Sequence, residues 1–422
     1  MSNDSAANAA ERSAGEPNPP APPIAASILY ATYAVGLSSN ALIMMLRVLV
    51  PLWAIHLEMA PSEIGLAIGA TGVLPFLFAI HGGALMDRLG SRRVTLFFAC
   101  ASTLLSGLYP ILPFIAALFL LQLLSGITTN MGWVGAQALI VRFARGDTEM
   151  IACFSVASRL GNLIAPIAVG AIWDLFGGFT AFMFCAAWSA MVVIALLMVP
   201  KHMTEPVGYL SSDPPMRAGD ILPRWNDYIQ AFAMMAIPAV AFIVTVTFVR
   251  IAVAAMQGSF YVVYLEGIGM TGTLIGILIA VTEGSGVIGS FLAGPAEKYL
   301  PPHWVLMINV VFSVLFVAIT PFLGGIFVML MLASWIRGTS QGMSQPVMFA
   351  ILSRAVSPRD QGLSIGLRST ANRLATMTVP PIMGFIVEAT DIETSFVVVG
   401  GVLIGICCAI CLVINRIPGF KT

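Results

Sequence analysis

The chain has 422 residues, of which 58% are hydrophobic and only 9% are charged, and its formal net charge is zero. Soluble domains carry about 25% charged residues. The composition therefore excludes an ordinary water-soluble protein and indicates a protein whose solvent is a lipid bilayer. A net charge of zero says nothing about partners, and the sequence has no basic patch of the kind that binds nucleic acid.

The first 24 residues are polar, rich in Ala and Pro, and lack the apolar core of a cleavable signal peptide. We expect residues 1–24 to form a disordered cytoplasmic tail. Apolar runs follow, and about 20 apolar residues suffice to cross a bilayer. Twelve transmembrane helices are predicted, near residues 27–57, 63–86, 93–110, 113–141, 150–174, 179–199, 231–265, 272–295, 303–322, 325–352, 360–388 and 395–415.

The longest polar interruption divides these helices into two groups of six. Residues 201–228 contain four prolines and several charges, which is typical of a linker. We therefore expect an all-α membrane protein with a six-helix bundle at 25–200, a second bundle at 229–417 and a short tail at 418–422.

The placement of Lys and Arg predicts the orientation. If the N-terminus is cytoplasmic, 14 of the 20 basic residues fall on the inner side and the other six lie inside predicted helices, so no outer loop carries one. Cytoplasmic loops of membrane proteins carry this excess of positive charge. Both termini are expected in the cytoplasm and the chain in the cytoplasmic membrane.

The fifth and eleventh predicted helices repeat one pattern, which indicates that the two halves are related. The shared residues, at identical spacing, are Arg159, Leu160, Pro166, Gly170 and Asp174 in the first half and Arg373, Leu374, Pro380, Gly384 and Glu388 in the second. Because symmetry favours a structural role, Arg159, Pro166, Arg373 and Pro380 are interpreted as a structural repeat pair.

The segment Gly82–Arg93 reads Gly-Gly-Ala-Leu-Met-Asp-Arg-Leu-Gly-Ser-Arg-Arg and joins the second and third predicted helices. It resembles the signature loop of the major facilitator superfamily, a family of secondary transporters. The resemblance implies two six-helix bundles around a central cavity and a cytoplasmic gate in which the signature Asp, here Asp87, meets the start of the eleventh helix. The gate residues implied are Gly83, Asp87, Arg88, Gly90, Arg92 and Arg359.

Six arginines lie inside predicted helices, where a charge costs about 2.5–3.5 kcal/mol on insertion scales, so we expect them to face the bundle interior. Arg47 and Arg250 lie near the middle of the first and seventh helices, which line the central cavity in the family that this chain resembles. A guanidinium on each helix suits a carboxylate, phosphate or sulfonate. The alternative is that each arginine pairs with an internal carboxylate or a helix end. The predicted substrate-binding residues are Arg47, Arg250, Arg337, Asn130, Gln257 and Gln341.

Glu283 is the one acidic residue deep within a predicted helix. A buried carboxylate can carry protons, so Glu283 is the candidate for proton coupling. The alternative is a static ion pair with Arg250, and the two interpretations are compatible, since a pair that opens on protonation couples proton and substrate binding.

The leading hypothesis is a secondary transporter of a small organic anion, coupled to protons and acting as a monomer. A first alternative is a proton-coupled efflux antiporter for hydrophobic or amphiphilic compounds. The antiporter motifs are degraded here, because Gln122 stands where that branch of the family has Arg and Ala165 where it has Gly. A second alternative is a non-transporting sensor or scaffold. We expect no cofactor, no metal site and no enzymatic activity.

Overall fold

The computed structural model describes residues 25–78, 85–86, 89–144, 147–201, 233–355 and 361–414. The expected tail at 1–24 and most of the linker at 201–228 lie outside these residues. All the regular elements in the described ranges are helical. The first half contains α2 (Ala26–His56), α3 (Pro61–Leu77), α5 (Ser91–Leu108), α6 (Ile115–Ala144) and α7 (Thr148–Met198).

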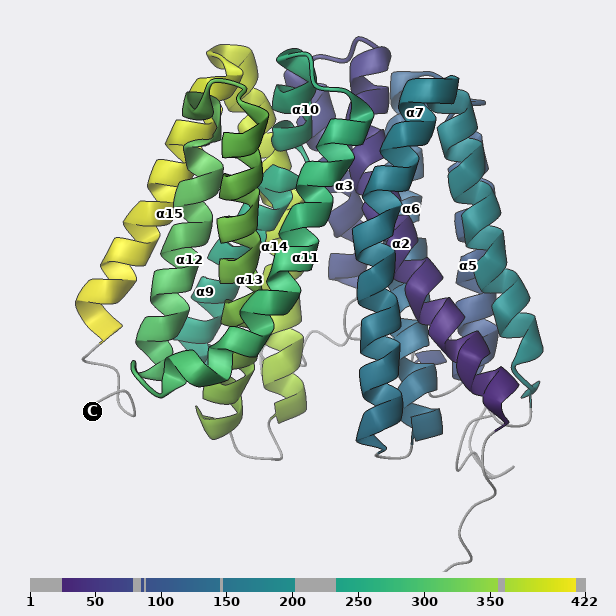
Figure 1. The fold of residues 1–422 in the computed structure, drawn as a ribbon, viewed down its shortest axis with the longest axis horizontal. Coiled ribbons are helices and arrows are strands. Elements are labelled where there is room, and N and C mark those ends of the chain that lie inside the picture. The colour runs from purple at the N-terminus through teal and green to yellow at the C-terminus, as the bar shows by residue number, and fades with distance from the viewer. Residues whose placement is uncertain are drawn as a thin grey trace, which may run out of the picture.

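The second half begins with the short η3 (Met234–Ala236) and ends with α15. Its helices are α9 (Pro238–Gln257), α10 (Phe260–Gly267), α11 (Gly272–Glu297), α12 (Pro302–Ala318), η4 (Thr320–Leu323), α13 (Phe327–Ala355), α14 (Gln361–Ala389) and α15 (Ile392–Ile414). Figure 1 shows the two halves side by side, with α5 and α7 on the right and α12 and α15 on the left. The expected all-α fold of two helical bundles is confirmed.

The described part of each of the twelve predicted ranges lies mainly in helix, and two local breaks explain why the helix labels differ from the prediction. Gly177 has φ 79° and ψ 175°, which interrupts α7 and divides it into the expected fifth and sixth spans. Glycine reaches this conformation without the steric cost that a side chain brings. A turn at Gly258 and Ser259 divides the expected seventh span into α9 and α10. The helix arrangement is therefore consistent with twelve spans.

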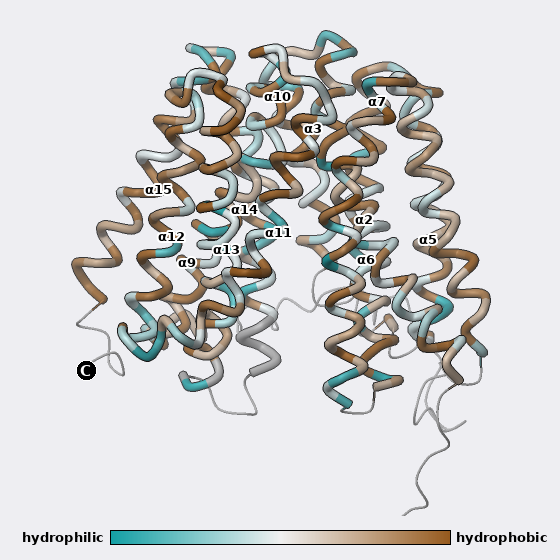
Figure 2. The backbone as a smooth tube through the Cα atoms, viewed as in Figure 1, coloured by the Kyte–Doolittle hydropathy of each residue, from teal (hydrophilic) through white to brown (hydrophobic). Residues whose placement is uncertain are grey.

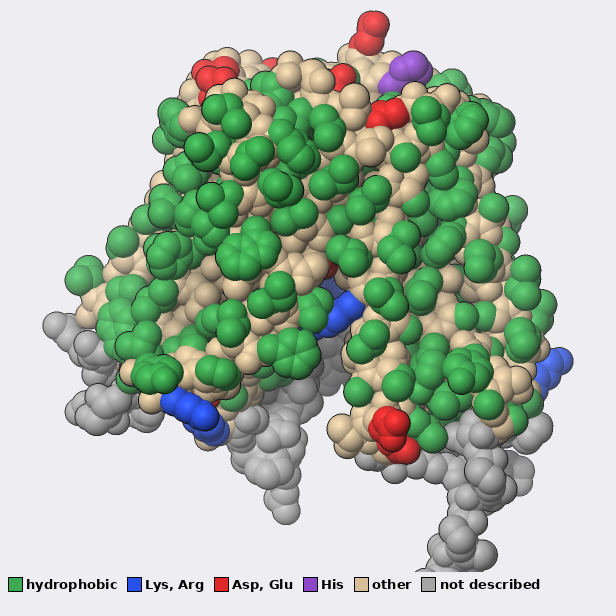
Figure 3. All heavy atoms as spheres, in the orientation of Figure 1, with side chains coloured by type: hydrophobic (Ala, Val, Ile, Leu, Met, Phe, Trp, Pro, Cys, Tyr) green, Lys and Arg blue, Asp and Glu red, His purple; other side chains and the backbone are tan. Residues whose placement is uncertain are grey.

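The helices are long and apolar enough for a bilayer. Within the described ranges, six helical segments have the length and hydropathy of a membrane span, counting α9 with α10 as one segment, and α3 and α12 are shorter apolar helices. Figure 2 shows hydrophobic residues along most of each helix, and Figure 3 shows apolar side chains covering the sides of the molecule. The protein is a multi-pass membrane protein.

The halves meet along two seams, one between α3 and α14 and the other between α7 and α11. Small residues permit close approach of the backbones. A Cβ atom at Gly65 would lie 2.4 Å from the carbonyl oxygen of Pro380, and one at Gly276 would lie 2.2 Å from that of Pro166. The repeated prolines therefore pack against glycines of the opposite half in both seams.

The two halves are in contact at one end of the molecule and separate toward the other end. In the space-filling view they touch along the upper part and leave a hollow that opens at the edge where α2 begins and α15 ends (Figure 3). A Lys or Arg side chain is visible inside this hollow. The geometry is that of a bundle pair closed at one end and open at the other.

Candidate functional site

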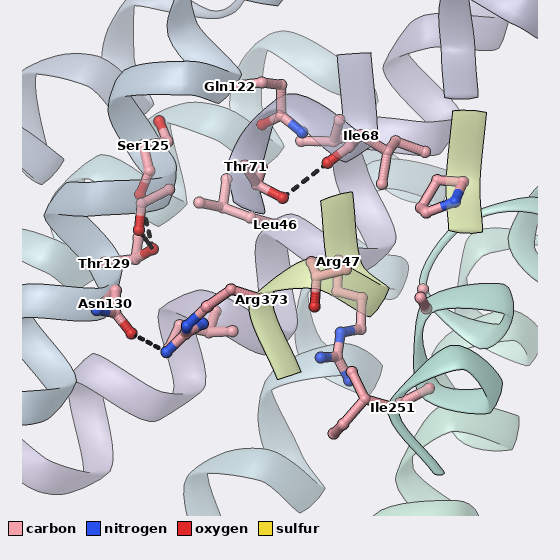
Figure 4. Close-up of a pocket in the computed structure, with 18 of the residues that line it drawn as sticks. Leu46, Arg47, Ile68, Thr71, Gln122, Ser125, Thr129, Asn130, Ile251 and Arg373 are labelled. Carbon is pink, nitrogen blue, oxygen red and sulfur yellow. Dashed lines mark hydrogen bonds between the residues drawn. The ribbon is translucent and has the colours of Figure 1, made fainter. Parts of the chain in front are cut away.

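A cavity of about 290 Å³ lies between the two halves. Helices α2, α3 and α6 line it from the first half, and α9, the turn after α9 and α14 line it from the second (Figure 4). The lining residues are Ile43, Leu46, Arg47, Val50, Pro51, Ile68, Thr71, Gln122, Ser125, Gly126, Thr129, Asn130, Ile251, Ala254, Ala255, Gly258, Asn372, Arg373, Thr376 and Pro380. In the transporters that the sequence resembles, a ligand site is expected in a cavity of this kind, shared by both bundles.

Two arginines give this cavity a permanent positive charge. Arg47 projects from α2 and Arg373 from α14, and Figure 4 shows both side chains in the cavity. Among the described residues that line it, none is acidic and none is aromatic. A guanidinium is cationic and carries five N–H donors, so these two side chains bring positive charge and hydrogen-bond donors to the cavity.

Arg373 makes a contact that crosses between the halves. Its Nη2 donates a hydrogen bond to the side-chain oxygen of Asn130 on α6, as Figure 4 shows. An amide oxygen orients the guanidinium but leaves its charge uncompensated. Arg373 is thus held in place with its charge still available.

Arg47 lies against the turn that follows α9. A Cβ atom at Gly258 would be 2.9 Å from the Cγ atom of Arg47, so the glycine makes room for the arginine stem. The structure gives Arg47 no hydrogen bond or ion pair with any described residue. Its guanidinium is a free donor group in the cavity.

A buried hydrogen-bond network supports part of the cavity wall on α6. The Tyr109 hydroxyl is fully buried and lies 2.6 Å from the Oε1 atom of Gln122 and 3.0 Å from the Oγ atom of Ser125. Gln122 and Ser125 both line the cavity. The position at which antiporters of the family carry Arg is therefore a neutral amide tied to a tyrosine.

Glu283 lies on α11 beside the other half. Its Oε2 atom accepts a hydrogen bond of 3.3 Å from the Nδ2 atom of Asn162 on α7. Its charge also acts on Arg250 and Arg337, so both arginines lie within electrostatic range. Glu283 thus touches the first half directly and acts on two cations of the second.

Arg250 lies beside the cavity without lining it, although its neighbour Ile251 does. Its Nε atom is buried and has no hydrogen-bond partner among the described residues. The cation that joins Arg47 in the cavity is Arg373, although its place in the sequence repeat predicts a structural role.

Three other predicted binding residues lie outside the cavity. Arg337 is 1% exposed, donates 3.1 Å to the Thr282 hydroxyl and stacks 4.7 Å from the centroid of the Tyr261 ring. The side-chain amide nitrogens of Gln257 and Gln341 are buried with no partner in the described ranges. Asn130 is the remaining member of that set, and it does line the cavity.

The predicted cytoplasmic gate is described only in part. Gly83, Asp87, Arg88 and Arg359 lie outside the described residues. Gly90 has φ 89° at the start of α5, a conformation that favours glycine. Arg92 is buried and donates 2.8 Å to the carbonyl oxygen of Leu196, a contact within the first half.

Most of the residues in the sequence repeat lie where the two halves meet. Pro166 and Pro380 both lie in the seams, whereas Arg159 is exposed and Arg373 lines the cavity. The acids that end the repeats, Asp174 and Glu388, bind backbone N–H groups of the opposite half. Their identical spacing was the signal that could have identified them.

Within the described residues, no group of three or more His, Cys, Asp or Glu side chains is placed to hold a metal ion. The chemistry available is electrostatic and hydrogen bonding, from side chains of both halves around one cavity.

The family model of the Major Facilitator Superfamily matches residues 32–251 and 243–420. The chain belongs to the Major Facilitator Superfamily. It is 25% identical over 358 residues to the "Tetracycline resistance protein, class C" of Escherichia coli, covering 80% of this chain and 83% of that protein. This membership identifies a secondary transporter.

Solved transporters share the fold. A single-residue mutant of the nucleoside transporter NupG has a TM-score of 0.77 at 16% identity and covers 91% of this chain and 99% of its own. A POT family transporter in complex with 5-aminolevulinic acid has a TM-score of 0.76 at 14% identity and covers 92% and 96%. At these identities the likeness is one of fold.

Proposed function

We propose that this transporter carries a small organic anion across the cytoplasmic membrane by alternating access, coupled to protons and acting as a monomer. The observation that carries the proposal is the cavity, in which Arg47 and Arg373 are joined by no acidic residue among those described. Electrostatic attraction is stronger inside a protein than in bulk water, and two uncompensated cations there favour an anionic ligand.

The arrangement of the two arginines suits an oxyanion that joins the halves. Arg47 belongs to the first half and Arg373 to the second. Guanidinium binds carboxylate or phosphate oxygens bidentately. In this scheme the substrate oxyanion replaces the Asn130 oxygen on Arg373, and small polar groups such as Thr71 and Thr129 bind the rest of the molecule.

Proton coupling is assigned to Glu283. An ionised Glu283 attracts Arg250 and accepts a hydrogen bond from Asn162 across the halves. Protonation removes the attraction and weakens the acceptor, so proton binding changes both the charge balance and the contact between halves. Proton and anion binding then favour each other, and this linkage is reciprocal.

The proposed orientation places the start of α2 and the end of α15 on the cytoplasmic side. The Lys and Arg distribution of the sequence supports it. In that orientation the hollow of Figure 3 opens to the cytoplasm, and the two seams lie nearer the outer face. The described conformation is then inward-facing.

A second candidate is efflux of hydrophobic or amphiphilic compounds. The relative that is a tetracycline resistance protein favours it. The cavity lining favours the anion instead, because none of the described lining residues is aromatic, and aromatic side chains are the usual contacts for a large amphiphile.

Uptake into proteoliposomes tests the proposal. The purified full chain would be offered a panel of small mono- and dicarboxylates, organic phosphates and lipophilic cations, with an imposed pH gradient. Saturable, gradient-driven movement of one organic anion, lost in the Arg373→Gln variant, supports the proposal. Movement of lipophilic cations with no response to any anion contradicts it and favours the efflux antiporter.

A further inference from the structure

Two arginines beside the cavity form a separate cationic cluster. Arg250 projects from α9 and Arg368 from α14, helices that pack against each other in the second half. Neither residue lines the cavity. Arg368 precedes Arg373 by five positions on α14, which at about 1.5 Å per residue places it roughly 7–8 Å nearer the start of that helix, toward the open end of the hollow.

Neither guanidinium forms an ion pair with a residue that the structure describes. The Nε atoms of Arg250 and Arg368 are buried and lack an acceptor among the described residues, and the structure gives neither side chain an ion pair there. The two arginines are carried by helices that pack against each other, and the charge of Arg368 opposes that of Arg250 whereas Glu283 attracts it. Like charges held together without an acceptor are costly in a membrane interior, so the arrangement implies a ligand.

Phe349 orients the guanidinium of Arg368 for such a ligand. The Arg368 guanidinium carbon lies 4.3 Å from the centroid of the Phe349 ring, on α13. Stacking on an aromatic face fixes the guanidinium plane while its N–H groups, which lie in that plane, stay available. An oxyanion meets a guanidinium along this edge.

We propose that Arg250 and Arg368 form a second anion-binding site, for a carboxylate or phosphate group, between the central cavity and the open end of the hollow. The site rests on the proposed function in one respect, since its occupant in the transport cycle is the oxyanion of the transported substrate. A ligand leaving Arg373 meets Arg368 on the same helix, so the arginines form a stepwise path.

Glu283 gives this site its link to the coupling group. An ionised Glu283 competes with an anion for Arg250, whereas a neutral residue at this position leaves Arg250 to the ligand. The same carboxylate that is proposed to carry the proton therefore controls occupancy of the second site.

Phosphate binding tests the site without any need to know the substrate. The probe is inorganic phosphate, titrated against purified full-length protein in nanodiscs at constant ionic strength, with equilibrium binding of radiolabelled phosphate and the thermal unfolding midpoint as readouts. The parent protein would be the Arg47→Gln/Arg373→Gln double variant, which lacks the cavity cations.

We expect the parent to bind phosphate and to gain stability from it. Adding Arg250→Gln or Arg368→Gln should weaken binding by roughly tenfold or more, as expected for loss of a charge-assisted hydrogen bond. Phe349→Leu keeps both charges and should weaken binding by a smaller factor. The matched control is Arg159→Gln, another intramembrane arginine but an exposed one in the other half, which should leave phosphate affinity unchanged.

Equal phosphate affinity in the parent and in both Arg250→Gln and Arg368→Gln overturns the site. An equal loss in Arg159→Gln overturns it too, because it indicates diffuse attraction to membrane cations. If the double-variant parent does not fold, the same comparison is made in the wild-type background by counting bound phosphate, where loss of one of two sites is expected.

Transport separates this proposal from the proposed function. Phosphate added on the open side should inhibit uptake of the organic anion by the wild type and not by Arg368→Gln. Arginine-dependent phosphate binding in a protein that moves no organic anion would uphold the site and overturn its place in a transport path. Anion transport that Arg368→Gln leaves equally sensitive to phosphate would overturn the site and spare the proposed function.

Discussion

Asp174 caps a helix of the second half, and Glu388, its counterpart in the sequence repeat, caps a helix of the first. The carboxylate of Asp174 accepts 2.8 Å hydrogen bonds from the Gly272 and Thr273 backbone N–H groups and a third from the Thr273 hydroxyl, at 2.5 Å. Glu388 accepts one from the Ser62 N–H, at 3.2 Å. The two helix N-termini, of α11 and α3, are thus each tied to the opposite half.

These contacts predict that the two carboxylates hold their end of the transporter closed. A negative charge at a helix N-terminus is worth about 0.3–1 kcal/mol, and up to about 2 kcal/mol in favourable geometry. Asp174→Asn should therefore populate the open form of this end, by a factor of several, because it removes the charge and leaves one acceptor oxygen for three donors. Glu388→Gln should do so less, because its remaining oxygen can still accept the single bond from Ser62. Spin labels at Phe114 and Phe322, both exposed, would report a longer distance component between the halves.

Glu266→Gln is the matched control for this experiment. Glu266 is an exposed carboxylate at the end of α10, and the structure gives it no bond to the opposite half among the described residues. Its distance distribution should match that of the wild type. A wild-type distribution for Asp174→Asn would show that the caps do not control closure.

The close backbone contacts in the seams predict that Gly→Ala substitutions there destabilise the protein. Gly→Ala in a helix interior normally stabilises by about 0.5–1 kcal/mol. At Gly65 and Gly276 the new methyl group would lie 2.4 Å and 2.2 Å from a carbonyl oxygen of the opposite half. Both substitutions should lower the unfolding midpoint or open the seam, with overpacking costing about 1–3 kcal/mol.

Gly401→Ala supplies the comparison, because a Cβ there meets nothing within 4 Å. It should leave the unfolding midpoint unchanged or raise it slightly. If Gly65→Ala and Gly276→Ala behave like Gly401→Ala, the backbone contact across the seams is not tight in the membrane.

Much of the fold was predictable because it depends on local properties. Apolar runs of sufficient length specify helices in a bilayer, where the backbone must satisfy its own hydrogen bonds. The break at Gly177 was predictable, because the sequence already separates the fifth and sixth spans there. The turn at Gly258 and Ser259 was not, since residues 231–265 form one predicted span and Gly258 has φ −84°, so the division of α9 from α10 required the structure.

The sequence predicted the kind of side chain in the candidate site better than it predicted which residues line the cavity. The sequence predicted Arg47 at the central cavity, where the structure places it, but it paired Arg47 with Arg250, whereas Arg373 shares its cavity. The reason is geometric, because helical position alone gives depth in the membrane and not the direction in which a side chain points. Partners such as Asp174 and Gly272, which are 98 positions apart, are joined only by the packing of the two halves.

The cavity arginines predict how anion transport responds to charge and to shape. Arg373→Lys keeps the charge and loses the bidentate fork. It should therefore raise the KM for the anion, while expression and the unfolding midpoint stay close to those of the wild type. Arg373→Gln removes the charge and should reduce kcat/KM by roughly tenfold or more. Arg47 variants should behave in the same way.

Arg159→Lys and Arg159→Gln are the controls for these kinetics, since Arg159 is the sequence counterpart of Arg373 but is exposed and does not line the cavity. Uptake by these variants should be close to wild type. If Arg159 and Arg373 variants lose transport to the same degree, the effect belongs to the repeat and not to the cavity.

The coupling role of Glu283 predicts a separation of exchange from accumulation. Glu283→Gln mimics the protonated side chain, keeps an oxygen that can accept from Asn162, and removes the attraction for Arg250. Substrate exchange across the membrane needs no net proton movement, so counterflow should persist, whereas accumulation driven by a pH gradient should be lost. Affinity for the anion should also depend less on pH, because Arg250 is then available at every pH.

The competing view makes Glu283 a structural counter-ion, and its loss would then leave Arg250 without any attracting charge and lower stability. Counterflow and gradient-driven uptake measured in the same proteoliposomes separate the two views: intact counterflow with no accumulation identifies coupling, equal loss of both together with a lower unfolding midpoint identifies a structural role, and intact gradient-driven uptake eliminates Glu283 as the proton carrier.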